Sequence, residues 1–259
     1  MIPTNMNTLT FTRKNTYAIL QLNRGKVNAI NHEMVKEIRT AISEAASDES
    51  VKGVILTGIP NFFTAGLDVI ELYSYNKHQI TEFFADFGGM FIDLVTFEKP
   101  LVAAITGYSP AGGCVMAIAC DYRIMAKGEK FTIGLNEVAV SIQISKNLID
   151  AYSYWIGNGK AHQYILDGAL LKVDQALNVG LINEAVALEE VLPRAEQQMQ
   201  KYLSFHEEIF KNTKRKLRQD WLSKLEVDPK KDLQQAAELW WQPEIRSRMK
   251  AFVESLQKK

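Results

Sequence analysis

The chain has 259 residues, of which 47% are apolar and 23% are charged, and its formal net charge is zero. This size and composition predict one globular domain with a sizeable core. The zero net charge gives no electrostatic reason to expect nucleic acid or an anionic membrane as a partner. No apolar run approaches the ~18 residues of a membrane-spanning helix, so we expect a cytoplasmic protein with no membrane contact.

The two cysteines, Cys114 and Cys120, lie six residues apart in an apolar run. Neither this spacing nor the scattered histidines predict a metal site, and two cysteines do not make a disulfide framework. We therefore expect no bound metal and a reduced, intracellular compartment.

The first quarter of the chain predicts a hairpin followed by a helix. Residues 8–13 and 17–22 are short runs of β-forming residues joined by Lys14 and Asn15. Asn31 is a predicted helix cap, and apolar residues recur after it at helical spacing, namely Met34, Ile38, Ile42 and Ala45.

Further strands and helices then alternate. Residues 51–57, 101–106 and 121–126 are predicted to be buried strands. A helix is expected over about 78–97, with one broad apolar face formed by Ile80, Phe83, Phe84, Phe87, Phe91 and Leu94, and another is expected from Gly112. Strand–turn–helix units of this kind are typical of an α/β fold.

The strand signal ends near residue 188, and the rest of the chain is predicted to be helical, with Pro193, Pro229 and Pro243 between its segments. We accordingly expect a core at 1–195 that carries the functional site, and a helical region at 196–259.

Two glycine-containing segments give the first functional signal. The segment 64–68 contains Gly66, and the segment 111–113 follows a predicted strand and opens a helix, whose N-terminus favours negative charge. The N–H groups of Leu67 and Gly112 are therefore candidates to hold one carbonyl oxygen as it becomes an enolate. The alternative is that both segments are merely tight turns.

Glu137 is a lone carboxylate among apolar neighbours, Leu135, Val138 and Val140. These neighbours are expected to desolvate it and to raise its pKa toward that of a general base. The alternative is an idle, solvated glutamate.

Two other patterns have an ordinary structural interpretation as well as a functional one. The aromatic residues between Phe83 and Phe91 indicate a core stripe, part of which is a candidate wall for an acyl-tail pocket. The basic run Lys211, Lys214, Arg215, Lys216 and Arg218 is typical of a solvated helix face, with a phosphate-binding patch as the alternative.

The segments 28–31, 63–68, 99–107 and 110–114 together resemble the crotonase (enoyl-CoA hydratase/isomerase) superfamily. A later pattern also matches, namely Gly157, Ala161, Leu166, Gly168, Ala176 and Gly180-Leu181-Ile182. The resemblance covers roughly residues 8–200. It implies an α/β spiral of ββα units, a helical C-terminal region used for trimerisation, and a homotrimer or dimer of trimers. It also implies an acyl-CoA substrate, with CoA entering as the thioester and no further cofactor.

The resemblance also assigns roles to individual residues. Leu67 and Gly112 take the two oxyanion-hole positions, and Ala29 lies where the family folds around CoA. Asn136 is expected to contact the acyl group or to position the glutamate. The residues expected along the pantetheine and thioester are Ala65, Gly66, Leu67, Asp68 and Val69. Basic residues of the C-terminal helices are expected near the CoA phosphates.

The predicted reaction depends on one substitution. Hydratases of the family place a first carboxylate immediately after Gly-Gly-Cys, where this chain has Val115, whereas the second carboxylate position is kept as Glu137. Residues 134–137 resemble the mitochondrial-type enoyl-CoA isomerases, which move a double bond from the β,γ to the α,β position. Isomerisation needs only one base, and Val115 is expected to border the substrate and to keep water away from the conjugated product. The alternatives are a hydratase or other crotonase-type lyase or hydrolase, and a non-catalytic acyl-CoA-binding paralogue.

The loop after Glu137 departs from the related isomerases. Ser141 stands where glycine is usual, and Gln143 brings an amide into a segment that is expected to be apolar. Either the loop backbone differs, or the acyl pocket is reshaped for a more polar substrate.

Overall fold

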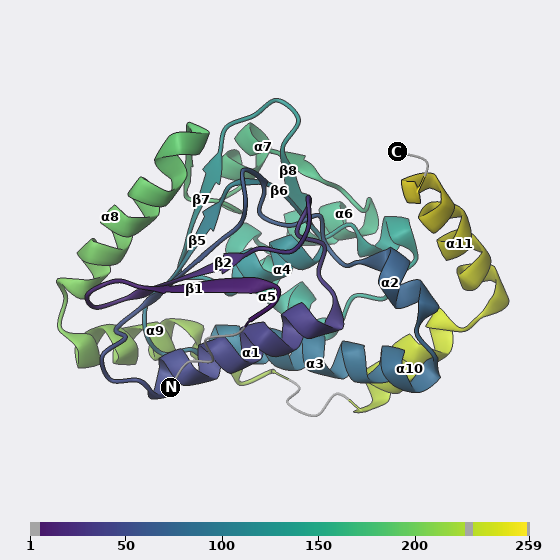
Figure 1. Cartoon of the computed structure of the whole chain (residues 1–259), viewed down its shortest axis with the longest axis horizontal. Helices are drawn as coiled ribbons and strands as arrows, with labels where there is room; N and C mark the ends of the chain where they lie inside the picture. The colour runs from purple at the N-terminus through teal and green to yellow at the C-terminus, as the bar shows by residue number, and fades with distance from the viewer. Residues whose placement is uncertain (1–5, 226–229, 258–259) are drawn as a thin grey trace.

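The computed structural model describes residues 6–225 and 230–257, in which two sheets are wrapped by helices (Figure 1). In the larger sheet the spatial order is β1-β2-β3-β5-β7-β10, and only β1 is antiparallel to its neighbour. Its strands are β1 (Leu9–Arg13), β2 (Ala18–Leu22), β3 (Val54–Thr57), β5 (Leu101–Ile105), β7 (Tyr122–Ala126) and β10 (Glu184–Val186). The predicted hairpin is confirmed, with Leu9 paired to Leu22.

The smaller sheet has the order β4-β6-β8-β9. Its strands are β4 (Asn61–Phe62), β6 (Gly107–Pro110), β8 (Thr132–Gly134) and β9 (Leu171–Lys172). Each of β3, β5 and β7 is followed directly by a strand of this sheet and then by a helical segment. This repetition of ββα units is the α/β spiral that the sequence resemblance predicts. The short strands of the second sheet were not predicted, because two to four residues carry too little alternation to identify a strand.

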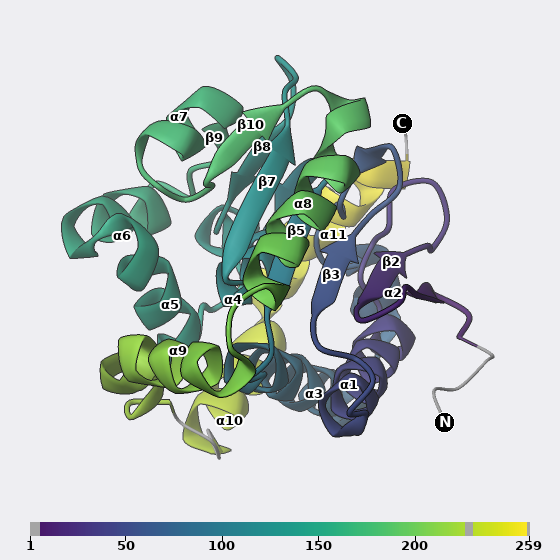
Figure 2. The ribbon, with the colours of Figure 1, turned by 90° about the vertical axis from the view of Figure 1, so that its left-hand side faces the viewer.

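Alternate residues of the parallel strands pack into two separate apolar clusters. Leu101 and Ala103 of β5 face the main core, whereas Val102 and Ala104 face a smaller cluster under α8 (Val191–Leu203). Figure 2 shows α8 lying across β5 and β7. Burial on both faces explains why these strands are continuous apolar runs in the sequence.

Three helices cover the opposite side of the large sheet: α1 (His32–Ser47), α3 (Lys77–Thr96) and α4 (Gly112–Ala119). Asn31 caps α1 as predicted, since its side chain accepts a hydrogen bond from the N–H of Met34 at 3.0 Å. In α3 the aromatic stripe is largely buried, which positions its phenylalanines beside α4.

The remaining helical segments connect the strands or form the C-terminal region. They are α2 (Val69–Ser74), η1 (Glu137–Val140), α5 (Lys146–Ile156), α6 (Asn158–Leu166), α7 (Val173–Asn178), η2 (Leu188–Glu190), α9 (Glu207–Leu222), α10 (Lys230–Trp240) and α11 (Pro243–Gln257). From Val191 onward the described residues form only helices and their connections, as predicted. Pro193 lies in the first turn of α8 and Pro243 begins α11, whereas Pro229 lies outside the described residues. The predicted boundary between 195 and 196 falls inside α8.

The last two helices fold back over this chain's own α2 and α3. The ring of Trp240 on α10 meets Phe84 edge-on at 5.6 Å between centroids. From α11, the Arg246 side chain donates to the carbonyl oxygen of Tyr73 at 3.0 Å and stacks on the Tyr73 ring. The C-terminal helices therefore close one side of the space beside α3.

The basic run on α9 is not the uniformly solvated face that its composition predicts. Lys214 and Arg218 are buried, and their charged groups lie 2.7 and 2.8 Å from the two carboxylate oxygens of Asp121. Because they are four residues apart, they share one helix face, which packs inward. Asp121 also accepts a hydrogen bond from the N–H of Leu101 at 2.8 Å.

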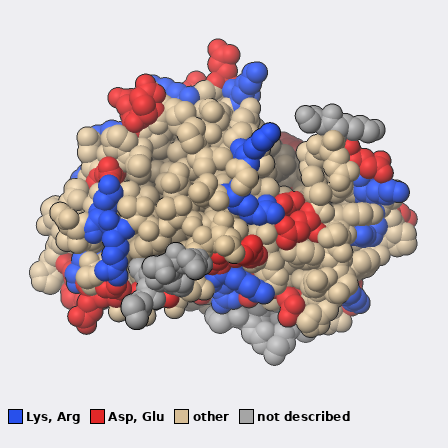
Figure 3. Space-filling view, in the orientation of Figure 1, with Lys and Arg blue, Asp and Glu red and all other residues tan. Residues whose placement is uncertain are grey.

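Charges on the visible surface are mixed rather than segregated. Figure 3 shows acidic and basic side chains close to one another over the face that it displays, with large uncharged areas between them. Among the residues that the structure describes, no helix is long and apolar enough to cross a membrane.

Candidate active site

The two glycine-containing segments lie side by side. Gly66 has a φ of +86°, and a Cβ placed on it would lie 3.3 Å from the carbonyl oxygen of Pro110. The segment is held against residues 28–31, since the N–H of Ile30 donates to the carbonyl oxygen of Gly66 at 2.8 Å and the N–H of Asp68 donates to that of Ile30 at 2.8 Å. Segments far apart in sequence thus form one compact turn.

The N-terminus of α4 has an unusual backbone. Ala111, the residue before the helix, has φ 45° and ψ −113°, a conformation that non-glycine residues rarely adopt. A side chain on Gly112 would come within 2.8 Å of Ile30, and one on Gly113 would come within 2.7 Å of Thr64. A side chain at Gly112 would have to displace only the flexible end of Ile30, whereas one at Gly113 would press on both Thr64 and Ser109. The strain at Ala111 fits a functional turn.

Two N–H groups remain available at this turn. Among the described residues, the N–H groups of Leu67 and Gly112 donate none of the backbone hydrogen bonds. Both residues line a cavity of about 340 Å³. Such donors at a helix N-terminus favour an oxygen that carries negative charge. The sequence prediction of an oxyanion site at Leu67 and Gly112 has this geometry to support it.

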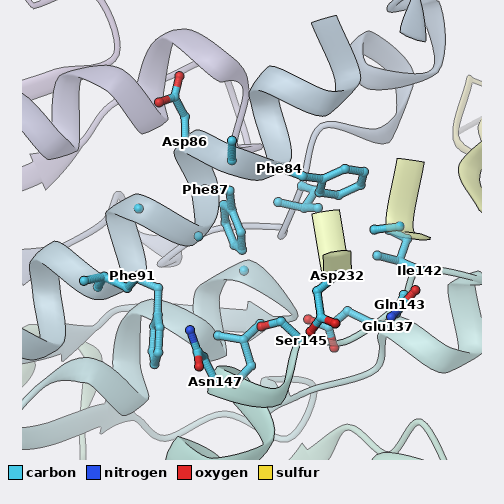
Figure 4. Close-up of a pocket in the computed structure, with 18 of the residues that line it drawn as sticks. Phe84, Asp86, Phe87, Phe91, Glu137, Ile142, Gln143, Ser145, Asn147 and Asp232 are labelled. Carbon is cyan, nitrogen blue, oxygen red and sulfur yellow. The ribbon is translucent and has the colours of Figure 1, made fainter. Parts of the chain in front are cut away.

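The cavity has one aromatic wall and one polar wall (Figure 4). Phe84, Phe87 and Phe91 of α3 form the aromatic wall, as the tail-pocket interpretation of the stripe requires. The polar groups lie along the opposite side, among Ile142 and Leu148, and come from η1, the segment after it, the start of α5 and the first helix of the C-terminal pair. They are Glu137, Gln143, Ser145, Asn147 and Asp232.

Glu137 is the most buried carboxylate of the cavity, with 5% of the residue exposed. Its Oε2 atom has no hydrogen-bond partner among the described residues. Burial raises the pKa of Glu137 from its ordinary value of 4.5 to about 7, because the charged form loses its water. The predicted neighbour effect is only partly right, since Leu135 is buried but Val138 is 48% exposed. The residue has the pKa of a general base at neutral pH.

No cation pairs with Glu137 among the described side chains. The buried groups that feel its charge are Cys114 and Tyr152, and the pKa of each is raised, first by burial and then by nearby negative charge. A carboxylate in these surroundings takes up a proton more readily than one beside a lysine or arginine.

Val115 is fully buried within α4 and does not line the cavity. No carboxylate replaces it at that point of the helix. Two further carboxylates line the cavity, Asp86 of α3, which pairs with Arg39, and Asp232 of α10, and sequence reasoning missed both. The predicted helical region at 196–259 was expected to mediate assembly, so nothing in its local pattern marked a residue of the cavity.

The other predicted substrate residues lie around the turn rather than in the cavity. The Asp68 carboxylate caps α2 and pairs with Arg24 at 2.8 Å, and Arg24 also donates to the carbonyl oxygen of Ala29 at 2.8 Å. Ala65 is exposed at the surface. The predicted residues that do not line the cavity are Ala29, Ala65, Gly66, Asp68, Val69, Val115 and Asn136.

The loop after Glu137 keeps a sharp turn although glycine is absent. Ser141 has φ 61° and ψ 36°, in the left-handed region that favours glycine. The N–H of Ile142 donates to the carbonyl oxygen of Glu137 at 2.9 Å, which ties the turn to the base. Gln143 follows and lines the cavity. Both sequence interpretations, a different loop backbone and a reshaped acyl pocket, stay predictions.

Known proteins give an independent comparison. A family described as enoyl-CoA hydratase/isomerase matches residues 12–259. The chain is 32% identical over 243 residues to mitochondrial enoyl-CoA delta isomerase 1 of Mus musculus, covering 93% of this chain and 84% of the relative. It is also 32% identical over 201 residues to a short-chain-enoyl-CoA hydratase of Clostridium acetobutylicum, covering 77% of this chain and 76% of the relative.

Solved structures agree with this comparison. Human mitochondrial delta3-delta2-enoyl-CoA isomerase superposes with a TM-score of 0.93 at 27% identity, over 97% of this chain and 99% of that one. Its crystal structure thus shares nearly the whole fold, including the C-terminal helices. The chain belongs to the enoyl-CoA hydratase/isomerase family of enzymes, within the crotonase superfamily.

Proposed function

We propose that this protein is an enoyl-CoA isomerase that moves a β,γ double bond to the α,β position with Glu137 as its single base. The observation that carries the proposal is that Glu137, a buried carboxylate with no cationic partner among the described residues, lines the same cavity as Leu67 and Gly112. The N–H groups of these two residues donate no backbone hydrogen bond. The identity of 32% to a named delta isomerase points the same way.

The reaction begins with removal of a proton from the α-carbon of a 3-enoyl-CoA by Glu137. The electron pair shifts toward the thioester oxygen, and the N–H groups of Leu67 and Gly112 stabilise the resulting dienolate. Removing one such donor typically costs ~3 kcal/mol of barrier. The protonated Glu137 then delivers its proton to the γ-carbon, and the conjugated 2-enoyl-CoA leaves.

We also propose that Ala29 and the segment 65–69 contact the CoA portion outside the cavity, with Asn136 near the acyl group. Support comes from the place of Ala29 and the segment 65–69 around the turn that carries the Leu67 N–H, and from the place of Asn136 directly before Glu137. Assembly as a homotrimer or dimer of trimers, and a cytoplasmic location, remain predictions from the resemblance and the composition.

A hydratase is the second candidate, and Asp232 is the observation that favours it. Hydration across a double bond uses two carboxylates around one water in this family, and the cavity contains both Glu137 and Asp232. The isomerase remains preferred because Asp232 comes from a different element from the one that carries the hydratase carboxylate after Gly-Gly-Cys.

The experiment follows 3-hexenoyl-CoA by the absorbance gained on conjugation, for the wild type, Glu137→Gln and Asp232→Asn. We expect Glu137→Gln to lower kcat by about 10²- to 10⁴-fold, the usual contribution of a general base. Asp232→Asn is the matched control, and its kcat is expected to stay within about threefold of wild type.

The alternatives give different results. Hydration of 2-hexenoyl-CoA by the wild type, with no conversion of 3-hexenoyl-CoA and loss in both variants, would establish the hydratase instead. Binding of an acyl-CoA without turnover of either substrate would indicate the non-catalytic paralogue.

A further inference from the structure

Resting on the proposed isomerase function, we propose that the acyl group of the substrate carries a neutral hydrogen-bonding substituent, such as a hydroxyl, which Gln143 binds on the polar wall of the cavity. The proposal concerns substrate class and adds a specificity-determining residue outside the oxyanion turn and the base.

The first observation is an unmatched polar group. The Oε1 atom of Gln143 is buried and has no hydrogen-bond partner among the described residues, although Gln143 lines the cavity. A buried acceptor without a partner costs ~1–3 kcal/mol, so native proteins generally pair such groups with protein, water or ligand. A carboxamide offers both an acceptor and donors, and a hydroxyl group can satisfy either one.

The second observation is that Gln143 does not stand alone. The Ser145 side chain lines the same wall, opposite Phe87 and Phe91 (Figure 4). A saturated acyl chain is bound best by a pocket that is apolar on all sides, because it cannot replace the water that polar wall groups lose. The aromatic wall suits the carbon chain, and the polar wall suits a substituent.

The third observation is the charge of the cavity. Its acidic residues are Asp86, Glu137 and Asp232, and its basic residue among those described is Arg39. The Arg39 guanidinium is already paired, with Asp86 at 2.7 Å and Asp93 at 2.8 Å. A carboxylate on the acyl chain would meet negative charge without an uncommitted cation, so we infer that the substituent is neutral.

The position of Gln143 indicates where the substituent lies. Ile142 and Gln143 also line a second, outer hollow beside α11, to which Glu244 and Arg248 bring one charge of each sign. Gln143 therefore lies where the cavity meets the C-terminal helices, away from the α4 turn that would hold the thioester oxygen. A polar group beyond the double bond would reach it.

The test compares kcat/KM for three substrates: 3-hexenoyl-CoA, 6-hydroxy-3-hexenoyl-CoA, and 3-hexenedioyl-CoA, in which carbon 6 is a carboxylate. In the wild type we expect the hydroxy substrate to be favoured over 3-hexenoyl-CoA by about tenfold or more, as one matched hydrogen bond allows. The dioyl substrate is expected to be at least about tenfold poorer than 3-hexenoyl-CoA.

In Gln143→Leu, the ratio of kcat/KM for the 6-hydroxy substrate to kcat/KM for 3-hexenoyl-CoA should fall to about one or below, because the variant removes the amide and leaves an apolar side chain in its place. The matched control is Gln163→Leu, which makes the same chemical change at an exposed position on α6, outside the cavity and the outer hollow, and should keep the wild-type ratio. The readout is a ratio within one preparation, so the fraction of folded enzyme cancels.

A wild-type ratio near one, with both substrates converted, would overturn the inference and leave the isomerase intact. A second measurement covers failure of the proposed function itself, namely the dissociation constants of hexanoyl-CoA and 6-hydroxyhexanoyl-CoA by calorimetry. Binding of the hydroxy ester about tenfold more tightly, with loss of that preference in Gln143→Leu, supports the inference even without turnover. Equal affinities overturn it.

Discussion

Two carboxylates, the partly buried Asp121 and the buried Glu137, lie near α4 in opposite surroundings. Asp121 follows the helix and is held by two buried cations, Lys214 and Arg218, and by a backbone N–H. Glu137 lines the cavity, and its Oε2 has no hydrogen-bond partner among the described residues. Both side chains are shielded from water, yet only one has its charge compensated.

The difference separates a structural role from a chemical one. Asp121, with its two buried cations, joins α9 to the sheet. A buried carboxylate without cations is poised to change its protonation state, as the pKa of about 7 for Glu137 shows. Burial alone therefore does not identify a catalytic acid; the missing counter-charge does.

The largest expected effect on stability is at the compensated site. Asp121→Asn would leave the Lys214 and Arg218 charges buried without their counter-ion, and we expect a loss of about 3–5 kcal/mol in the free energy of unfolding. Urea denaturation followed by far-ultraviolet circular dichroism measures it.

The control is Glu98→Gln. It breaks an exposed ion pair with Arg215, which lies on α9 like Lys214 and Arg218. Its cost is expected to stay below about 1 kcal/mol. Equal losses in the two variants would remove the distinction between a partly buried, compensated carboxylate and a surface ion pair.

An intermediate effect, of opposite sign, is expected at the uncompensated site. The folded protein keeps the Glu137 proton up to a pH of about 7, whereas the unfolded chain releases it near pH 4.5. Between these values the folded state binds more protons, so the free energy of unfolding falls as pH rises through this window and is then level. Glu137→Gln removes that slope and should be the more stable protein at pH 8, by about 3 kcal/mol.

The comparison is sharpened by repeating both denaturations at pH 4.5, where the gain in Glu137→Gln should vanish. A pH-independent difference between wild type and variant would contradict the assignment of the shifted pKa to this residue. Catalytic activity should depend on pH in the opposite direction from stability. Because the base works only when it is ionised, kcat/KM should rise with pH through about 7.

The smallest effect is expected in the loop that carries Glu137. Ser141 occupies a left-handed conformation that costs ~1–2 kcal/mol for a non-glycine residue. Glycine would remove this cost, but its greater conformational entropy in the unfolded chain would offset part of the gain. Ser141→Gly should therefore stabilise the protein by about 0.5 kcal/mol, whereas Ser141→Val should destabilise it, as thermal unfolding would show. A stable valine variant would mean that the turn relaxes.

Much of the fold was predictable because its signals are local. Asn31 as a cap, the apolar spacing of α1, and the continuous apolar runs of β3 and β5 each depend on a few neighbouring residues. The turn at Gly112 was identified because two adjacent glycines follow a predicted strand and open an apolar helix, a pattern that is visible in the sequence itself.

What escaped prediction depends on contacts between distant segments. Asp232 reaches the cavity only because α10 folds back on α3, and Lys214 is buried only because α9 packs against Asp121. Neither residue has a local pattern that distinguishes it from a solvated one. Gln143 was noticed as an anomaly in the sequence, but its unpartnered oxygen is visible only in the folded cavity.

The central claim is that one uncompensated carboxylate moves the proton itself. The most direct test supplies 3-hexenoyl-CoA deuterated at C2 in ordinary water and locates deuterium in the conjugated product. Glu137 is shielded from water and its Oε2 has no hydrogen-bond partner to relay a proton, so the account predicts deuterium at C4. Product that carries only solvent hydrogen at C4, at every stage of the reaction, would contradict it and require a second proton donor.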